Sequence, residues 1–136
     1  MNDNIKNLII DFGGVLVDLD RSRCINSFKK IGADCIEEML NPYYQLGLLK
    51  DLENGDITTD IFHEELRKAA GKDITDSQID DAWNSFLVSV PSYKLDLLLS
   101  LRERYSVYLL SNTNQIHWEM SCERFFSYKN SPIVKF

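Results

Sequence analysis

The sequence predicts an α/β protein in which an incomplete parallel sheet is interrupted by a large helical insertion. A continuous apolar segment ends at Asp11, and a second strand-like segment ends at Ser111. The roughly seventy residues that follow Asp18 show helical periodicity without strand-like alternation. Continuous apolar strands are typical of parallel sheets, whose strands are joined by long crossover connections. We therefore expect the two strands to pair in parallel.

The first strand is expected at residues 5–10, followed by Asp11 and by the glycines Gly13 and Gly14. Ligands of open α/β sheets bind beyond the carboxyl ends of the strands. An aspartate in that position can attack a phosphoryl group and carry it as an aspartyl-phosphate. The glycines allow the backbone to approach a ligand closely. Taken alone, however, the motif is explained better by a turn or a helix-capping aspartate.

Stripes of apolar residues at helical spacing predict several short helices in the insertion, expected at residues 25–31, 35–40, 43–52, 61–69 and 79–87. Glycines at positions 55 and 71 are expected to end two of them. Thr75 and Gln78 have the spacing of a capping box. The pattern predicts a small helical bundle at residues 18–90, and a core formed by residues 1–17 and 91–136.

The second strand is expected at residues 105–110, preceded by a helix that Pro91 opens. The strand segment is rich in β-branched and aromatic residues. The side of the helix expected to face the sheet carries Leu95, Leu98, Leu99 and Leu101.

Small polar residues follow the second strand, at positions 111–114. A hydroxyl and exposed backbone N–H groups at a helix start form an anion site, so Ser111 and the N–H of Asn112 are candidate phosphate donors. In isolation such a segment more often only caps a helix or makes a turn. The pairing with Asp11 favours a site, because two strands would then each end in a group suited to phosphoryl transfer.

Composition excludes several other classes of protein. The chain has 136 residues, a net charge of −6 and a pI near 4.8, which argues against a nucleic-acid-binding surface. No apolar run approaches the roughly 20 residues of a membrane span. The N-terminus lacks a signal-peptide pattern. The three cysteines, Cys24, Cys35 and Cys122, make no metal-binding or redox pair. We expect reduced thiols in a cytoplasmic protein.

These motifs, in this order, resemble those of the haloacid dehalogenase (HAD) superfamily of hydrolases, and the chain is most similar to the sugar-phosphatase branch with a helical cap. The matching features are the first motif at residues 9–18, the cap segment at 48–62 with its turn at 53–57, the helix opened by Pro91 and the second motif at 109–114. The resemblance implies a Rossmannoid parallel sheet, incomplete here, with the helical bundle as its cap. It also implies a phosphatase acting on small phosphorylated metabolites such as sugar phosphates.

The family pattern implies a role for each matched residue. Asp11 would be the nucleophile and a Mg²⁺ ligand, and the backbone carbonyl of Gly13 would be a second ligand. Ser111 would hold the phosphate together with the N–H of Asn112. Mg²⁺ suits such a site because it binds few carboxylates and keeps substrate oxygens and water in its shell.

The cap would close over the site and recognise the leaving group, so its residues would determine the choice of substrate. Four of its residues are candidates for facing a substrate, namely Tyr43, Tyr44, Gln45 and His63. For each of them, packing or simple solvent exposure is the more common explanation.

The sequence departs from the family pattern in its acid and base groups. The usual general acid/base two residues after the nucleophile is Gly13, which cannot move a proton. The family also needs a lysine in a third motif and an acidic pair in a fourth. Lys129 and Lys135 lie too close to Ser111 to fit the former, and the pair Asp80-Asp81 is explained by a solvated helix face. We therefore expect a truncated chain that is a weak or inactive phosphatase.

Two further outcomes follow from an incomplete sheet. The chain can be a non-catalytic remnant or a binding module that keeps the fold, and its exposed sheet can favour self-association. Residues 132–136 are candidates for a third strand.

A receiver domain does not fit, because its sheet has no such insertion after the first strand. A dinucleotide-binding domain does not fit either, because the glycine pair lacks the third glycine.

Overall fold

The computed structural model describes residues 4–128 and 131–132. The chain divides into two compact units. The sheet unit contains the described residues of segments 1–19, 87–112 and 119–136, and the helical unit contains residues 20–86 and 113–118. Each unit has its own buried residues. No helix in the described part of the chain is both long and apolar enough to cross a bilayer.

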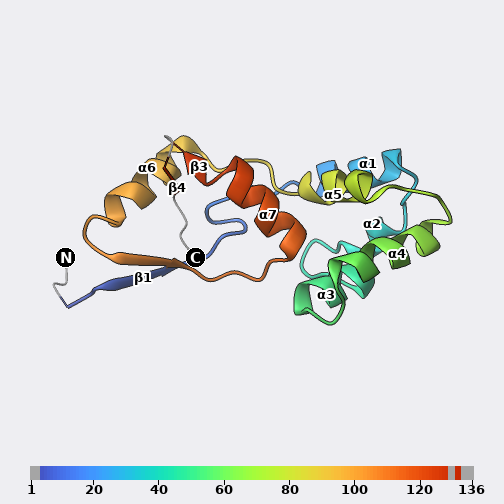
Figure 1. Cartoon of the computed structure of the whole chain (residues 1–136), viewed down its shortest axis with the longest axis horizontal. Coiled ribbons are helices and arrows are strands. Elements are labelled where there is room, and N and C mark those ends of the chain that lie inside the picture. The colour runs from blue at the N-terminus through green and yellow to red at the C-terminus, as the bar shows by residue number, and fades with distance from the viewer. Residues whose placement is uncertain (1–3, 129–130, 133–136) are drawn as a thin grey trace. The chain divides into compact units, whose positions relative to one another are not determined.

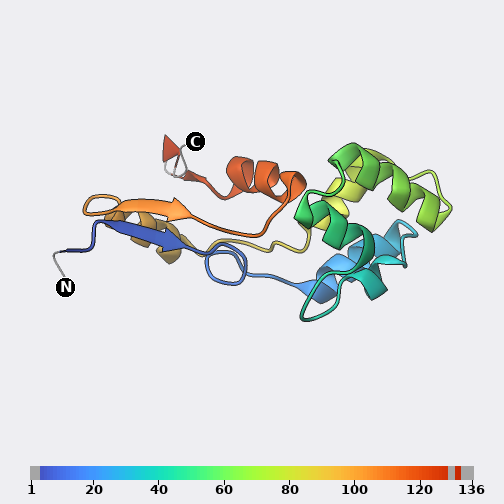
Figure 2. The ribbon, with the colours of Figure 1, turned by 90° about the horizontal axis from the view of Figure 1, so that it is seen from below.

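The sheet unit is built on two parallel strands, β1 (Asn7–Ile10) and β2 (Ser106–Leu109). Asn7 lies opposite Ser106, and Ile10 lies opposite Leu109. The two strands lie side by side and run in the same direction (Figure 2). Helix α6 (Ser92–Leu101) packs against β2 and buries Leu95 and Leu98. The predicted parallel pairing and the predicted helix before the second strand are confirmed.

One face of this sheet is exposed. Along both strands, exposed side chains alternate with half-buried ones. Ile9 and Tyr108 lie opposite each other on the exposed face, with 69% and 56% of their surface accessible. Leu110, which continues the alternation beyond β2, is 70% exposed. The sheet therefore presents a strip of apolar side chains to solvent.

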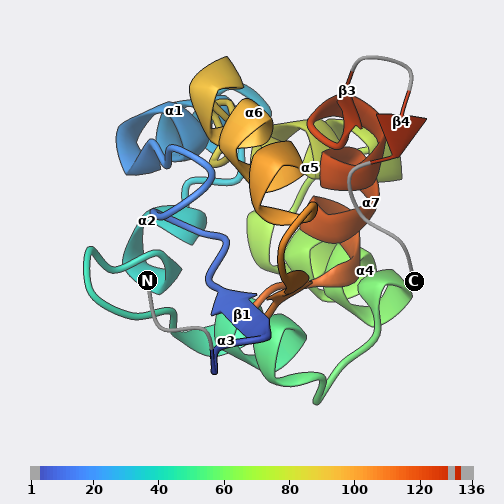
Figure 3. The same ribbon diagram turned by 90° about the vertical axis from the view of Figure 1, so that its left-hand side faces the viewer.

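The described end of the chain forms a separate hairpin after helix α7 (Gln115–Arg124). Strands β3 (Ser127–Tyr128) and β4 (Ser131–Pro132) pair with each other in antiparallel fashion, beyond the end of α7 (Figure 3). Within the described residues they do not join the sheet of β1 and β2. The third strand considered for residues 132–136 falls mostly outside the described residues.

The helical unit contains five helices that precede residue 87 (Figure 1). Helix α1 contacts α5, and helix α3 contacts α4. Their shared core is apolar, and its largest fully buried side chains are Trp83, Phe28 and Phe62. The helices are α1 (Arg21–Lys30), α2 (Ile36–Met39), α3 (Gly47–Asn54), α4 (Thr59–Ala70) and α5 (Asp76–Asn84). The predicted insertion of several short helices is confirmed.

Helix α3 begins later than the apolar spacing of residues 43–52 predicts. The N–H of Tyr43 donates to the Asn41 side chain over 3.0 Å, and the N–H of Leu46 donates to the carbonyl of Met39 over 2.8 Å. Residues 43–46 therefore form a loop that is hydrogen-bonded back toward α2, and Leu46 is extended, with φ −129° and ψ 164°. The prediction was wrong here because these local hydrogen bonds compete with the helix.

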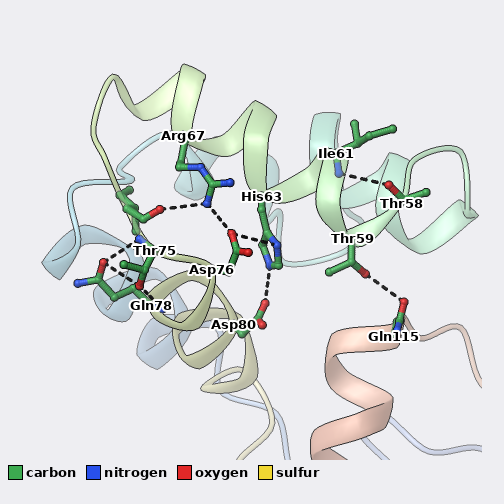
Figure 4. Close-up of polar contacts among 11 residues, drawn as sticks. Thr58, Thr59, Ile61, His63, Arg67, Thr75, Asp76, Gln78, Asp80 and Gln115 are labelled. Atoms are coloured by element: carbon green, nitrogen blue, oxygen red, sulfur yellow. Dashed lines mark hydrogen bonds and ion pairs between the residues drawn. The ribbon is translucent and has the colours of Figure 1, made fainter.

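The ends of the other helices agree with the sequence signals. The Thr75 hydroxyl accepts from the N–H of Gln78 over 3.1 Å, and the Gln78 side chain accepts from the N–H of Thr75 over 3.0 Å, so the predicted capping box is present (Figure 4). Gly55 and Gly71 end α3 and α4 with φ of 78° and 64°. Glycine adopts this left-handed conformation without steric cost.

Candidate active site

Asp11 follows the last residue of β1 and is exposed at the end of the strand. Its Oδ1 atom accepts a hydrogen bond from the N–H of Phe12 over 2.7 Å. This bond orients the carboxylate through one oxygen. The site lies wholly within the sheet unit, because residues 1–19 and 87–112 belong to the same unit.

The loop after Asp11 is a compact turn held by its own backbone. The N–H groups of Val15, Leu16 and Val17 all converge on the carbonyl oxygen of Phe12, at 3.3, 2.9 and 3.1 Å. The Phe12 side chain is 2% exposed, and its ring lies 5.5 Å from that of Phe126. From α6, the Lys94 ammonium donates to the carbonyl of Val15. These contacts hold the loop in place on both sides, and so fix the backbone next to Asp11.

Gly13 and Gly14 differ in conformation, although they are adjacent. Gly14 has a φ of 74°, and its N–H donates to the carbonyl of Val17 over 2.9 Å. Gly13 is outside the left-handed region, and a Cβ added to it would meet only Leu19 Cδ1, at 3.8 Å. Among the described residues, the loop's backbone hydrogen bonds do not use the Gly13 carbonyl. Gly14 is therefore required by the turn, whereas Gly13 is not.

Ser111 lies at the same end of the sheet as Asp11. The N–H of Leu110 donates to the carbonyl of Ile10 over 3.0 Å, which extends the pairing to the residue before Ser111. Ser111 is half-buried, and Asn112 is exposed. The structure thus brings the ends of the first and second motifs to neighbouring strands, as parallel pairing requires.

The helix after the second motif begins at Gln115, three residues beyond Asn112. The Asn114 side chain accepts from the N–H of His117 over 3.0 Å, and the N–H of Trp118 donates to the Asn114 carbonyl over 2.9 Å. Asn114 is therefore the residue that caps α7. Ser111 and Asn112 belong to the loop that precedes the helix rather than to its first turn.

His117 is a buried polar residue that the sequence reasoning missed. Its side chain is 4% exposed and stacks on Trp83, with ring centroids 4.2 Å apart. Nε2 donates to the carbonyl of Trp83 over 2.9 Å, and Nδ1 lies 3.2 Å from the Asn114 side-chain nitrogen. Burial lowers the pKa of His117 to about 4, although the hydrogen bond to Trp83 opposes this shift. Asn114 and His117 have the spacing of an N-cap and the third helical residue. This spacing was the signal in the sequence that could have identified them.

The candidate cap residues are distributed between surface and core of the helical unit. Tyr43 is 91% exposed and Tyr44 is 56% exposed, while Gln45 is half-buried. His63 is 4% exposed and lies in α4. Three of these side chains are thus at least partly accessible to solvent, and His63 is not.

His63 is held between α4 and α5 by carboxylates (Figure 4). Its Nε2 lies 2.6 Å from Asp80 Oδ1, and its Nδ1 lies 3.4 Å from Asp76 Oδ1. Arg67 also donates to Asp76, over 2.6 Å, and this hydrogen bond lowers the pKa of that carboxyl group. Asp80, which the sequence placed on a solvated face, is half-buried and pairs with His63, whereas Asp81 is exposed.

Comparison with known proteins identifies related enzymes. The chain is 39% identical over 129 residues to a D-ribitol-5-phosphate phosphatase of Bacteroides thetaiotaomicron, a match covering 95% of this chain and 63% of that protein. It resembles the crystal structure of a HAD family enzyme from the same organism, an aspartate-to-alanine mutant in complex with magnesium and inorganic phosphate. The TM-score is 0.90 and the identity 53%, over 96% of this chain and 64% of that one.

A predicted HAD-like hydrolase of Porphyromonas gingivalis is also similar, with a TM-score of 0.79 and 42% identity, over 87% of this chain and 56% of that structure. No family model matches the sequence. The fold, an α/β sheet with a helical insertion, and the two motif-bearing strands match those of these HAD structures. The chain belongs to the HAD family. It spans slightly less than two thirds of the length of the two Bacteroides relatives.

The two loop glycines should respond differently to a side chain. We predict that Gly13→Ala and Gly13→Asp change the free energy of unfolding by less than about 0.5 kcal/mol, because the backbone and the space allow a Cβ. Gly14→Ala should cost about 1 kcal/mol, because its φ is positive. Urea denaturation of the three variants and the wild type would measure this. Equal losses at both positions would contradict the difference in conformation.

The pH dependence of stability should contain a contribution from Glu53, in α3. Partial burial raises the pKa of Glu53 from 4.5 to about 7. Between these values the folded state holds a proton that the unfolded state releases, so stability falls as pH rises through this window. His117 acts oppositely, since its lowered pKa makes stability fall as pH drops from about 6.5 toward 4.

We predict that Glu53→Gln removes the Glu53 contribution and leaves that of His117. The variant should match the wild type near pH 4.5 and exceed its free energy of unfolding at pH 8 by about 1 kcal/mol, a value reduced for solvent exposure. Denaturant unfolding of both proteins at several pH values provides the comparison. A constant difference across this range would show that Glu53 does not titrate between the two states as described.

Proposed function

We propose that this chain carries the nucleophile and phosphate-binding loop of a Mg²⁺-dependent phosphatase acting on a small phosphorylated metabolite such as a sugar phosphate. The observation that carries the proposal is the parallel pairing of β1 and β2, which places Asp11 and Ser111 after neighbouring strand ends. The matched relatives include a D-ribitol-5-phosphate phosphatase and a HAD enzyme crystallised with magnesium and phosphate.

In the proposed reaction, an oxygen of the Asp11 carboxylate attacks phosphorus while the bond from phosphorus to the leaving oxygen breaks. The Ser111 hydroxyl and the N–H of Asn112 donate to the phosphoryl oxygens. The leaving oxygen takes its proton from water, since Gly13 has no side chain to provide one. Water then attacks phosphorus, which releases phosphate and restores the Asp11 carboxylate.

The oxygen donors of the loop fit Mg²⁺. The Asp11 carboxylate is exposed, and the Gly13 carbonyl is not used by the turn's backbone hydrogen bonds in the described chain. Both are hard ligands of the kind that Mg²⁺ prefers, and the bound ion would neutralise charge on the phosphoryl group. Among the described residues there is no cluster of three or more acidic, histidine or cysteine side chains suited to a metal. We therefore propose weak metal binding and weak or absent activity for this polypeptide.

The helical segment, residues 18–90, is proposed to act as the cap that selects the leaving group. Its helices have a core of their own, which supports a separately packed element. The exposed side chains of Tyr43 and Tyr44 are the candidates for contacting a substrate. A cytoplasmic location is also proposed, supported by three cysteines that are all free of disulfides.

The catalytic proposal predicts that hydrolysis depends on the Asp11 carboxylate. With Mg²⁺ and p-nitrophenyl phosphate, any hydrolysis by the wild type should fall to the buffer rate in Asp11→Asn, because the amide is a poor nucleophile. Asp34→Asn, at an exposed position in the helical unit, should retain the wild-type rate. Initial rates over hours at high enzyme concentration provide the measurement. Equal rates in the wild type and Asp11→Asn would instead support the non-catalytic or binding alternative for this chain.

We also propose that two copies of the chain associate through the exposed face of the sheet. The apolar side chains of Ile9, Tyr108 and Leu110 on that face support this proposal. In sedimentation velocity experiments, the sedimentation coefficient of the wild type should rise with protein concentration, whereas Tyr108→Lys should remain monomeric. Tyr93, which is 67% exposed and lies on α6, provides the control, and Tyr93→Lys should behave as the wild type. If the sedimentation coefficient of the wild type does not change with concentration, this association is excluded.

A further inference from the structure

The loop that carries the proposed phosphate donors is held at both ends. At its first end, the N–H of Leu110 donates to the carbonyl of Ile10 in the sheet unit. At its second end, Asn114 caps α7 within the helical unit. Three residues, Ser111, Asn112 and Thr113, connect these points. Asn112 and Thr113 therefore lie within two residues of the helix cap.

The second attachment depends on the His117 ring. Because a carbonyl only accepts, Nε2 carries the hydrogen that is donated to Trp83, and Nδ1 therefore accepts from the Asn114 side-chain amide. The other atom of that amide, Oδ1, accepts the backbone N–H of His117. Asn114 is 6% exposed, so both ends of its side chain are satisfied in a buried setting. The ring and the cap residue thus fix each other.

Neighbouring contacts make this arrangement rigid. The His117 ring stacks on Trp83 at 4.2 Å, and its centroid lies 6.1 Å from that of Phe86. Ile116 is 5% exposed and belongs to the apolar core of the helical unit. The Thr59 hydroxyl donates to the Gln115 side chain over 3.4 Å (Figure 4). A neutral imidazole with both nitrogens engaged has a single orientation here.

We propose that His117 is a positioning residue for the phosphate-binding loop: through Asn114 it orders the span that presents the Ser111 hydroxyl and the Asn112 N–H. The inference rests on the proposed function, since it concerns the same site. It assigns a role in phosphate binding to a buried histidine that acts only through Asn114. Loosening one end of the span would add an ordering cost to binding.

The first test needs no ligand. In ¹⁵N relaxation measurements on the whole chain, His117→Phe should lower the order parameters of the Asn112 and Thr113 amides, because phenylalanine keeps the stacking but loses both ring hydrogen bonds. His117→Gln, which can still donate to the Trp83 carbonyl, should restore them in part. Ile36→Val removes a methyl group from the same unit's core and should leave these order parameters unchanged.

The second test uses inorganic phosphate with Mg²⁺ as the probe, followed by the chemical shift of the Asn112 amide. His117→Phe should weaken the apparent affinity about tenfold, His117→Gln less, and Ile36→Val not at all. If His117→Phe loses stability but keeps wild-type order parameters, His117 is only structural and the inference is wrong. If the wild type does not bind phosphate, the proposed function fails for this chain, and the relaxation data still decide whether His117 orders the loop.

Discussion

The parallel hydrogen bonding between β1 and β2 is the constraint on which the candidate site depends. The strands are separated by almost a hundred residues in the sequence, yet Ile10 lies opposite Leu109. This register brings a carboxylate and a hydroxyl to one edge of the sheet, which has two strands among the described residues. An antiparallel pairing would have placed them at opposite ends.

The loops on the two sides of the site are ordered in different ways. The loop after Asp11 is stabilised locally, by N–H groups that converge on the Phe12 carbonyl and by the buried Phe12 ring. The loop after β2 is short and is followed by a helix cap in which an asparagine and a histidine of the helical unit bond to each other. The nucleophile and the phosphate donors therefore depend on separate sets of interactions. A substitution that damages one need not damage the other.

Much of the architecture could be predicted from the sequence, because it rests on periodicity and on cap residues that act over a few positions. The two strands, the helical insertion and the capping box at Thr75 all follow from local patterns. The late start of α3 could not be predicted, since it depends on hydrogen bonds from Tyr43 and Leu46 that compete with an otherwise helical pattern. The pairing of His63 with Asp80 and the docking of His117 on Trp83 join distant segments, which periodicity does not report.

The conformation of Gly13 bears on how readily the site could change during evolution. The residue takes the position of the general acid/base in the family pattern, but its backbone is not one that only glycine adopts, and the space around it is open. A glycine codon ending in a pyrimidine becomes an aspartate codon by a single base change. The turn therefore accommodates a side chain at position 13 without a change in its own backbone conformation.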